Sequence, residues 1–222
     1  MKPSQLAQRL GHEFSDSELL DLALRHRSSG VQNNERLEYL GDAVLGMIIA
    51  EALFERFSGA KEGDLTRARA RLVKEPTLAE IARGFGLGQF LNLGSGELKS
   101  GGRDRDSILS DALEAIIGAI YLDAGFSVVR SVVISWYAER LETMNPLKLE
   151  KDPKTRLQEW LQSQGQPLPV YRVEQETGEP HDREYQVSCS VQGNEQPYMG
   201  QGTGRRRAEQ MAAQAALEAL GQ

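Results

Sequence analysis

The spacing of apolar residues changes once along the chain, near residue 145. Between residues 4 and 141, apolar side chains recur every three and four positions, which places them on one face of an α-helix. Asp16 and Thr77 are residue types that cap helix starts, and Gly125 is a type that ends helices. This part is therefore predicted to be all-helical, with its clearest helices at 17–26, 36–57, 77–86 and 107–125.

The segment 142–153 breaks this pattern, because it is polar, has no sustained period and carries Pro146 and Pro153. Beyond it, helical spacing is found in 152–165 and again in the alanine-rich segment 205–220. Partial alternation and turn residues between those helices indicate three strands, at 170–178, 183–191 and 196–202. We predict an all-helical domain at 1–145, a linker at 146–152 and an α-β-β-β-α domain at 153–222.

The sequence also bears on where the protein works. No stretch reaches the roughly 20 apolar residues of a membrane span, and the longest apolar run, 43–50, is interrupted by Gly46. The N-terminal sequence MKPSQLAQRLGHEF lacks the apolar core of a signal peptide. Cys189 is the only cysteine, so no intrachain disulfide is possible. We therefore expect a cytoplasmic protein with no membrane partner.

The charge of the chain is acidic overall, with a formal net charge of −6. Residues 1–150 carry 18 Lys and Arg against 22 Asp and Glu, a balance of −4, and the remainder carries 8 against 10, a balance of −2. Neither part is basic as a whole. Affinity for a nucleic acid must therefore come from local patches of positive charge.

Two predicted helices carry carboxylates among apolar residues. Glu35, Glu38 and Asp42 are spaced three and four apart on the first helix, and Asp111 and Glu114 are spaced three apart on the second. Like charges at these spacings destabilise a helix by about 0.2–0.5 kcal/mol per pair. A bound cation or open solvent would compensate for this repulsion.

If the two helices pack, Glu38, Asp42, Asp111 and Glu114 converge. Oxygen ligands without His or Cys suit Mg²⁺ or Mn²⁺ better than Zn²⁺. Such a site activates water and stabilises the leaving oxygen of a phosphodiester. The alternative is a solvated acidic face, and the spacing alone does not decide between the two.

Two further charged segments are less specific. Arg67, Arg69 and Arg71 alternate, so they cannot share one helix stripe, and phosphate contact and simple solvation are equally open. The segment 96–107, GELKSGGRDRDS, lacks the spacing of a nucleotide-binding loop, so we expect no nucleotide cofactor. We expect it to be a mobile connector whose Asp106 or Ser107 caps the next helix.

The segment NNERLEYLGDAVL, residues 33–45, closely resembles the signature of the ribonuclease III family. DALEAIIGAIYLD, residues 111–123, resembles the second acidic motif of that family, and the C-terminal part resembles its double-stranded-RNA-binding domain. The resemblance covers essentially the whole chain. It implies a homodimeric endoribonuclease that cleaves double-stranded RNA, such as ribosomal-RNA precursors and structured messenger RNA. The implied products carry 5′-phosphates, 3′-hydroxyls and short 3′ overhangs.

The resemblance also implies roles for individual residues. The metal ligands would be Glu38, Asp42, Asp111 and Glu114, with Mg²⁺ as cofactor, Mn²⁺ as its substitute, and Asp42 and Glu114 as catalytic residues. Glu35 and Glu62 match accessory acids, of which Glu62 approaches the active centre from the partner subunit. Tyr39 matches an aromatic side chain that enters a socket on the partner.

In the second domain the resemblance implies three RNA contacts. The first minor-groove contact would come from Thr155, Gln158 and Glu159, and the second from the loop carrying Pro180 and His181. Arg205 and Arg206 stand at a helix start, where backbone N–H groups also favour phosphate. The alternative interpretation is a catalytically inactive protein that binds duplex RNA.

Overall fold

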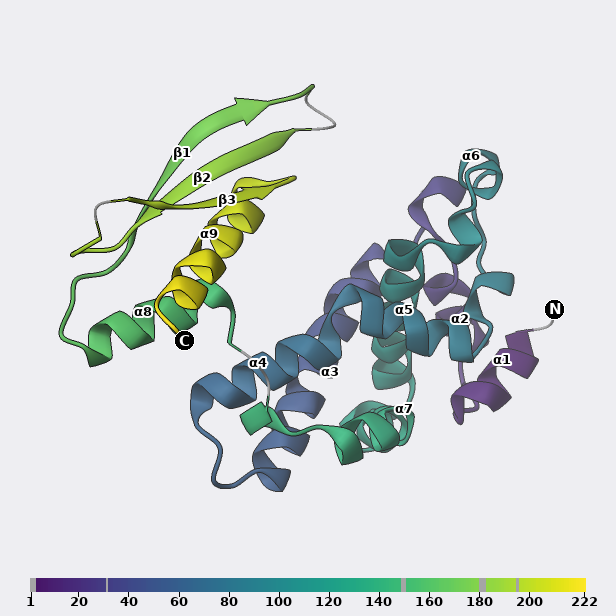
Figure 1. Ribbon diagram of the computed structural model, residues 1–222. Coiled ribbons are helices and arrows are strands. Elements are labelled where there is room, and N and C mark those ends of the chain that lie inside the picture. The colour runs from purple at the N-terminus through teal and green to yellow at the C-terminus, as the bar shows by residue number, and fades with distance from the viewer. Residues whose placement is uncertain (1–2, 31, 149–150, 180–182, 195) are drawn as a thin grey trace. The chain divides into compact units, whose positions relative to one another are not determined.

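The computed structural model describes residues 3–30, 32–148, 151–179, 183–194 and 196–222 (Figure 1). The chain forms two compact units, residues 1–149 and 150–222, and each has a hydrophobic core of its own. The first unit is helical, and the second contains a three-stranded antiparallel sheet with two helices.

The described part of the first unit contains seven α-helices: α1 (Pro3–Leu10), α2 (Ser17–Ala23), α3 (Glu35–Arg56), α4 (Glu62–Val73), α5 (Glu75–Gly84), α6 (Ser95–Lys99) and α7 (Asp106–Thr143). Short 3-10 turns stand between or after them: η1 (Arg27–Ser29), η2 (Leu87–Gln89), η3 (Gly102–Asp104) and η4 (Pro146–Lys148). The pair α3 and α7 forms the most extensive packing of the unit, and α5 packs against α7 as well (Figure 1).

The helices α3 and α7 approach so closely that their backbones touch. An added Cβ at Gly41 would lie 1.7 Å from the backbone oxygen of Glu114. An added Cβ at Gly118 would lie 2.3 Å from the backbone oxygen of Leu37. A larger residue at either position would push the helices apart. This contact therefore determines how the acids of α7 lie relative to those of α3.

The helix α7 is interrupted at Gly125, whose φ of 79° is left-handed. The sequence predicted that a helix would end here, and the structure shows a break after which the helix resumes and runs to Thr143. The second half is anchored because Val129, Val133 and Tyr137 are fully buried in the same core. Burial therefore extends the helix beyond the residue that local preference alone would make its end.

Within the described residues, α7 is the one helix long and apolar enough to cross a membrane. The expectation that no segment has this composition was therefore wrong. The apolar side chains have another explanation, because those of Ile116, Ile117 and Ile120 are fully buried inside the first unit.

The predicted helix caps and the glycine-rich segment 96–107 agree with the structure only in part. Asp16 caps α2, accepting a hydrogen bond of 2.9 Å from the backbone N–H of Glu18, as expected. Thr77 was wrong as a cap: α5 begins two residues earlier, and the Thr77 hydroxyl donates instead to the carbonyl of Arg71. The predicted caps at Asp106 and Ser107 were also wrong, since Arg105 is the N-cap residue of α7. The predicted mobile connector contains α6 and η3.

The second unit has the predicted order α8 (Pro153–Ser163), β1 (Val170–Thr177), β2 (Glu184–Ser190), β3 (Tyr198–Gly202) and α9 (Arg205–Ala219). The strands pair antiparallel in the order β1-β2-β3. An added Cβ at Gly200 would lie 2.1 Å from the backbone nitrogen of Ala212, so β3 and α9 touch. The small side chains of α9 allow this approach, and Cys189 lies buried in the same core.

Candidate metal centre and nucleic-acid interface

Three of the four proposed metal ligands converge in the structure. Glu38 on α3 and Asp111 and Glu114 on α7 each place one carboxylate oxygen within 4.8 Å of the other two. All three side chains are half-buried. Asp42, one turn after Glu38 on α3, is exposed and lies outside this group of three. Its charge nevertheless acts on Glu114.

The electrostatics of this acidic cluster are unfavourable in the protein alone. Burial, followed by the charges of Asp42, Asp111 and Glu38, raises the pKa of Glu114 to about 8. Burial also raises the pKa of Glu38, with Asp111 as the next cause. A carboxylate cluster that resists ionisation in this way is stabilised by a cation.

The pKa of Asp111 is raised as well, mainly by burial. A hydrogen bond from Ser110 and the charges of His26 and Arg27 act in the opposite direction. The charge of Glu75, at the start of α5, raises the pKa of Asp111 further. Burial therefore outweighs the opposing hydrogen bond from the neighbouring Ser110, and residues far away in the sequence contribute less.

A hollow of about 360 Å³ opens beside the cluster, and Arg27 and Arg105 are among the residues that line it. Arg27 lies 3.7 Å from Glu35, and Arg105 lies 2.9 Å from Glu97. Neither arginine was predicted from the sequence, because Arg27 begins η1 and Arg105 is the N-cap residue of α7, both outside the predicted helical motifs. The complete lining is His26, Arg27, Asn34, Glu35, Glu38, Glu97, Arg105, Ser107, Ile108 and Asp111.

The donor set fits a hard divalent cation. The group of converging ligand atoms consists of carboxylate oxygens and contains no His or Cys. Such oxygen ligands favour Mg²⁺ or Mn²⁺ over softer metals. The half-buried acids also leave the adjoining hollow open to a substrate phosphate.

A second face of α3 is apolar and exposed. The exposed fractions of the Tyr39, Met47 and Phe54 side chains are 82%, 59% and 72%. Met47 and Phe54 also line a pocket of about 610 Å³ with Glu62 and Arg69 of α4. Within one chain, Glu62 accepts a hydrogen bond of 2.8 Å from Thr66 and is not a member of the acidic cluster.

In the second unit, four proposed RNA-binding residues line one hollow of about 810 Å³: Thr155, Gln158, Arg205 and Arg206. Lys154, which the sequence analysis missed, lines the same hollow and lies 4.4 Å from the ring centroid of Tyr171. Glu159 is not part of this lining and pairs with Lys151 at 2.5 Å. The proposed contacts Pro180 and His181 lie outside the residues that the structure describes.

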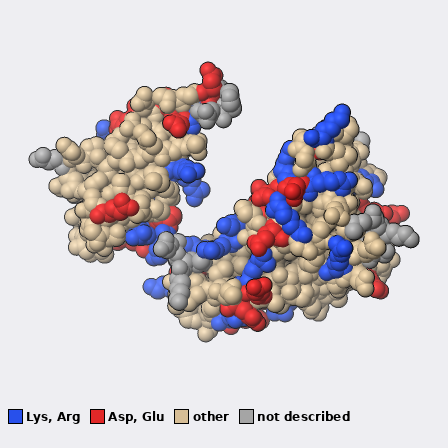
Figure 2. All heavy atoms as spheres, turned by 45° about the vertical axis from the view of Figure 1, so that its right-hand side comes forward, with Lys and Arg blue, Asp and Glu red and all other residues tan. Residues whose placement is uncertain are grey.

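The start of α9 is suited to bind an anion. Its N-cap residue is Gly204, which provides no side chain to cap the first backbone N–H groups. Arg205 and Arg206 follow directly and are exposed, although Arg205 also pairs with Glu209 at 3.0 Å. Free amides and guanidinium groups at one helix end favour phosphate. Figure 2 shows that basic and acidic side chains are interspersed on the visible surface of both units.

Comparisons with known proteins identify the family. A model described as ribonuclease-III-like matches residues 16–141, and one described as a double-stranded RNA binding motif matches residues 153–220. The chain belongs to the ribonuclease III family. It is an endoribonuclease with a double-stranded-RNA-binding domain, as the sequence resemblance implied, and the nuclease domain of this family is metal-dependent.

Related proteins match this chain over almost its whole length. Ribonuclease 3 from Vibrio vulnificus is 56% identical over 216 residues, which are 97% of this chain and 96% of that protein. Ribonuclease 3 from Pseudomonas fluorescens is 58% identical over 218 residues, covering 98% of this chain and 95% of that protein.

Solved structures of a ribonuclease III nuclease domain match the first unit. A crystal structure of this domain from Campylobacter jejuni has a TM-score of 0.61 and 45% identity, covering 64% of this chain and 97% of that one. A second structure of the same domain is described as having structural flexibility in a region involved in dimer formation. It has a TM-score of 0.61 and 46% identity, covering 62% of this chain and 97% of that one.

Proposed function

We propose that this member of the ribonuclease III family hydrolyses double-stranded RNA with Mg²⁺ held by Glu38, Asp42, Asp111 and Glu114, and that Mn²⁺ substitutes for it. The observation that supports this proposal is the convergence of three half-buried carboxylates within 4.8 Å. The proposed products have 5′-phosphates, 3′-hydroxyls and short 3′ overhangs. The proposed substrates are ribosomal-RNA precursors and structured messenger RNA in the cytoplasm.

The acidic residues of the site and the arginines of the hollow have different proposed roles. A divalent ion, when bound, supplies Lewis-acid polarisation of the phosphoryl group and activation of a water nucleophile. Glu114 would hold the cation from within the converging group, and Asp42 from its exposed position one turn after Glu38. Arg27 and Arg105, which line the hollow, are placed to neutralise non-bridging phosphate oxygens.

The test of this function is cleavage of end-labelled duplex RNA with and without metal. We expect cleavage with Mg²⁺ or Mn²⁺ and none with a chelator, and products that carry 5′-phosphates. Binding without cleavage at every Mg²⁺ concentration would instead establish the alternative, a catalytically inactive duplex-binding protein. Cleavage that continues in chelator would contradict the metal site.

The Mg²⁺ concentration needed for cleavage should fall as the pH rises. Because the pKa of Glu114 is raised to about 8, a proton occupies this ligand below that pH in the metal-free protein. Metal binding must release that proton, so the apparent affinity for Mg²⁺ rises with pH and levels off above it. The Mg²⁺ concentration for half-maximal cleavage should therefore fall by up to about tenfold per pH unit on the approach to that pKa. An unchanged value between acidic and alkaline pH would contradict this assignment.

We also propose that the protein is a homodimer. The exposed apolar face of α3 supports this, since Tyr39, Met47 and Phe54 lie on one helix and solvent exposure of such side chains is unfavourable. A twofold interface would place Tyr39 of each chain in the pocket lined by Met47 and Phe54 of the other. Tyr39 directly follows the proposed metal ligand Glu38, and Glu62 lines the pocket that Tyr39 of the partner would enter. The interface would therefore bring Glu62 toward the active centre of the partner chain.

Light scattering at micromolar concentration should therefore return twice the 24.6 kDa mass of one chain. Tyr39→Arg should shift the protein toward monomer, because the interface would bury an unpaired charge. Leu98→Arg is the control, because it makes the same kind of change at an exposed apolar residue on another helix, and it should leave the dimer intact. A wild-type monomer that still cuts both strands would contradict the dimer.

A further inference from the structure

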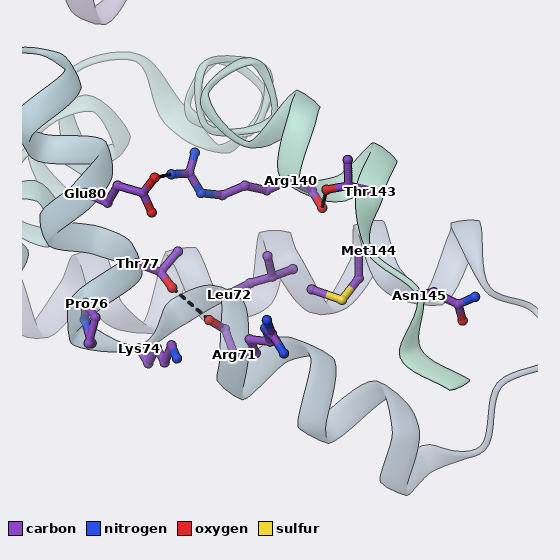
Figure 3. A pocket seen from close by; sticks show the side chains of 10 residues that line it. All are labelled: Arg71, Leu72, Lys74, Pro76, Thr77, Glu80, Arg140, Thr143, Met144 and Asn145. Atoms are coloured by element: carbon purple, nitrogen blue, oxygen red, sulfur yellow. Dashed lines mark hydrogen bonds and ion pairs between the residues drawn. The ribbon is translucent and has the colours of Figure 1, made fainter. Parts of the chain in front are cut away.

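A pocket of about 520 Å³ opens in the first unit between the end of α4, the start of α5 and the end of α7 (Figure 3). Its lining includes three cationic side chains, Arg71, Lys74 and Arg140, and one carboxylate, Glu80. The pocket is therefore locally basic in a chain whose formal net charge is −6. Such a local excess of positive charge attracts an anion.

The cations are not needed to cap the end of α4. The Thr77 hydroxyl donates to the backbone carbonyl of Arg71 at 2.9 Å (Figure 3). The Tyr137 hydroxyl donates to the carbonyl of Leu72 at 3.2 Å. These bonds already satisfy carbonyls that basic side chains often serve at a helix end. The positive charges at this position are therefore available for another partner.

Among the described residues of the first unit, no carboxylate pairs with two of the three cations. Arg140 pairs with Glu80 at 3.0 Å, which holds it at one side of the pocket (Figure 3). Arg71 and Lys74 are exposed, and the ion pairs found in the described part of the first unit do not include them. Their side chains can therefore turn toward a ligand without breaking an existing ion pair.

The shape of the pocket suits a nucleotide unit. Leu72 and Met144 lie between the Arg140–Glu80 pair and the side chains of Arg71 and Lys74 (Figure 3). Leu72 is buried, so the half-buried Met144 offers the apolar surface for a sugar or base, while the cations bind the phosphate. The volume is also within the range of about 300–1,000 Å³ that is usual for ligand pockets.

The helix α5 connects this pocket to the helix that carries two of the acids. Pro76 and Thr77, in the first turn of α5, line the pocket. The helix α5 also packs against α7, on which Asp111 and Glu114 lie. The pocket and these acids therefore belong to one packed group of helices, in which the pocket offers positive charge to a further phosphate of a strand bound at the acids.

We infer that this pocket binds a backbone phosphate of the RNA strand that is cut, with Arg71, Lys74 and Arg140 as its ligands. The inference rests on the proposed function and adds to it a phosphate contact within the nuclease unit, separate from the acidic cluster and from the RNA-binding domain. The contact fixes the position of the strand relative to the acids.

The test replaces single phosphates of a duplex RNA, one at a time, by uncharged methylphosphonates. Affinity of the full-length protein for each duplex is measured in chelator, which prevents cleavage. For wild type, each contacted phosphate should show a loss of affinity. In the double variant Arg71→Gln with Lys74→Gln, replacing the phosphate at one or two neighbouring positions should no longer lower the affinity. The slope of log affinity against log salt concentration should become shallower by about one to two.

A matched control is Arg56→Gln with Lys61→Gln, which makes the same charge change at exposed positions outside the pocket. It should keep the wild-type profile. Identical profiles and salt slopes for wild type and the pocket variant would overturn the inference, because the pocket would then contact no phosphate of the RNA strand. Failure of wild type to cleave duplex RNA with Mg²⁺ is a separate result, and it would overturn the proposed function instead.

Discussion

Glu114→Gln should lower the rate of duplex-RNA cleavage by about 10²–10³-fold, the range found when one essential electrostatic group is removed from an active site. Glu114 is the acid on which the other three act, since Asp42, Asp111 and Glu38 all raise its pKa. Glutamine keeps the size of the side chain but removes the negative charge that holds a cation. The fold and the affinity for duplex RNA in chelator should be unchanged, because the RNA-binding domain does not include this residue.

Single-turnover cleavage of a labelled duplex at saturating enzyme measures this effect without the contribution of binding. Glu139→Gln is a matched control, since it makes the same change at an exposed position of α7 outside the acidic cluster. It should leave the cleavage rate intact. If Glu114→Gln cleaved at the wild-type rate in physiological Mg²⁺, the assignment of this acid to the metal centre would be wrong.

The fold could be predicted from the sequence where burial and local preference agree. The long helix α3 and the order α8, β1, β2, β3, α9 followed directly from apolar spacing and turn residues. The predictions that failed depend on tertiary contacts. Thr77 was a reasonable cap by residue type, but its hydroxyl is used by the carbonyl of Arg71. Gly125 interrupts α7 as expected, and the buried residues after it make the helix resume.

The candidate site was predictable only in part. Spacing placed Glu38 on one helix and Asp111 and Glu114 on another, but it could not show that the helices meet. That meeting depends on backbone contact at Gly41 and Gly118, where the absence of a Cβ is visible only once both helices are placed.

The two arginines beside the acids gave no periodic signal at all. Arg27 begins η1 directly after His26, whose backbone N–H donates to the carbonyl of Asn92 at 3.1 Å. The bridge between Arg25 and Asn92 reinforces this connection. A contact between segments so far apart in the sequence has no local signature, so single-sequence reasoning could not assign these residues to the site.

The second large effect should come from removing the RNA-binding domain. A fragment of residues 1–149 contains the whole acidic cluster and a core of its own. The nuclease domain of the Campylobacter jejuni enzyme has also been solved as a separate structure. This fragment should therefore fold and keep the single-turnover rate at low salt. Near physiological salt it should lose on the order of 10²-fold or more in affinity for duplex RNA, because phosphate contacts supply much of that affinity.

The test measures the cleavage rate of the full chain and of the fragment at increasing ionic strength. It distinguishes a loss of RNA affinity from a loss of the cleavage step. In the full chain, Arg206→Gln should shift the curve in the same direction but less, since it removes one phosphate contact at the start of α9. Arg172→Gln, an exposed arginine on β1 outside the hollow, is its control. If the full chain and the fragment lost activity at the same salt concentration, the nuclease unit alone would hold the duplex. The RNA affinity would then be expected to come from the basic pocket beside α5, because the pocket lies in the fragment and Arg206 does not.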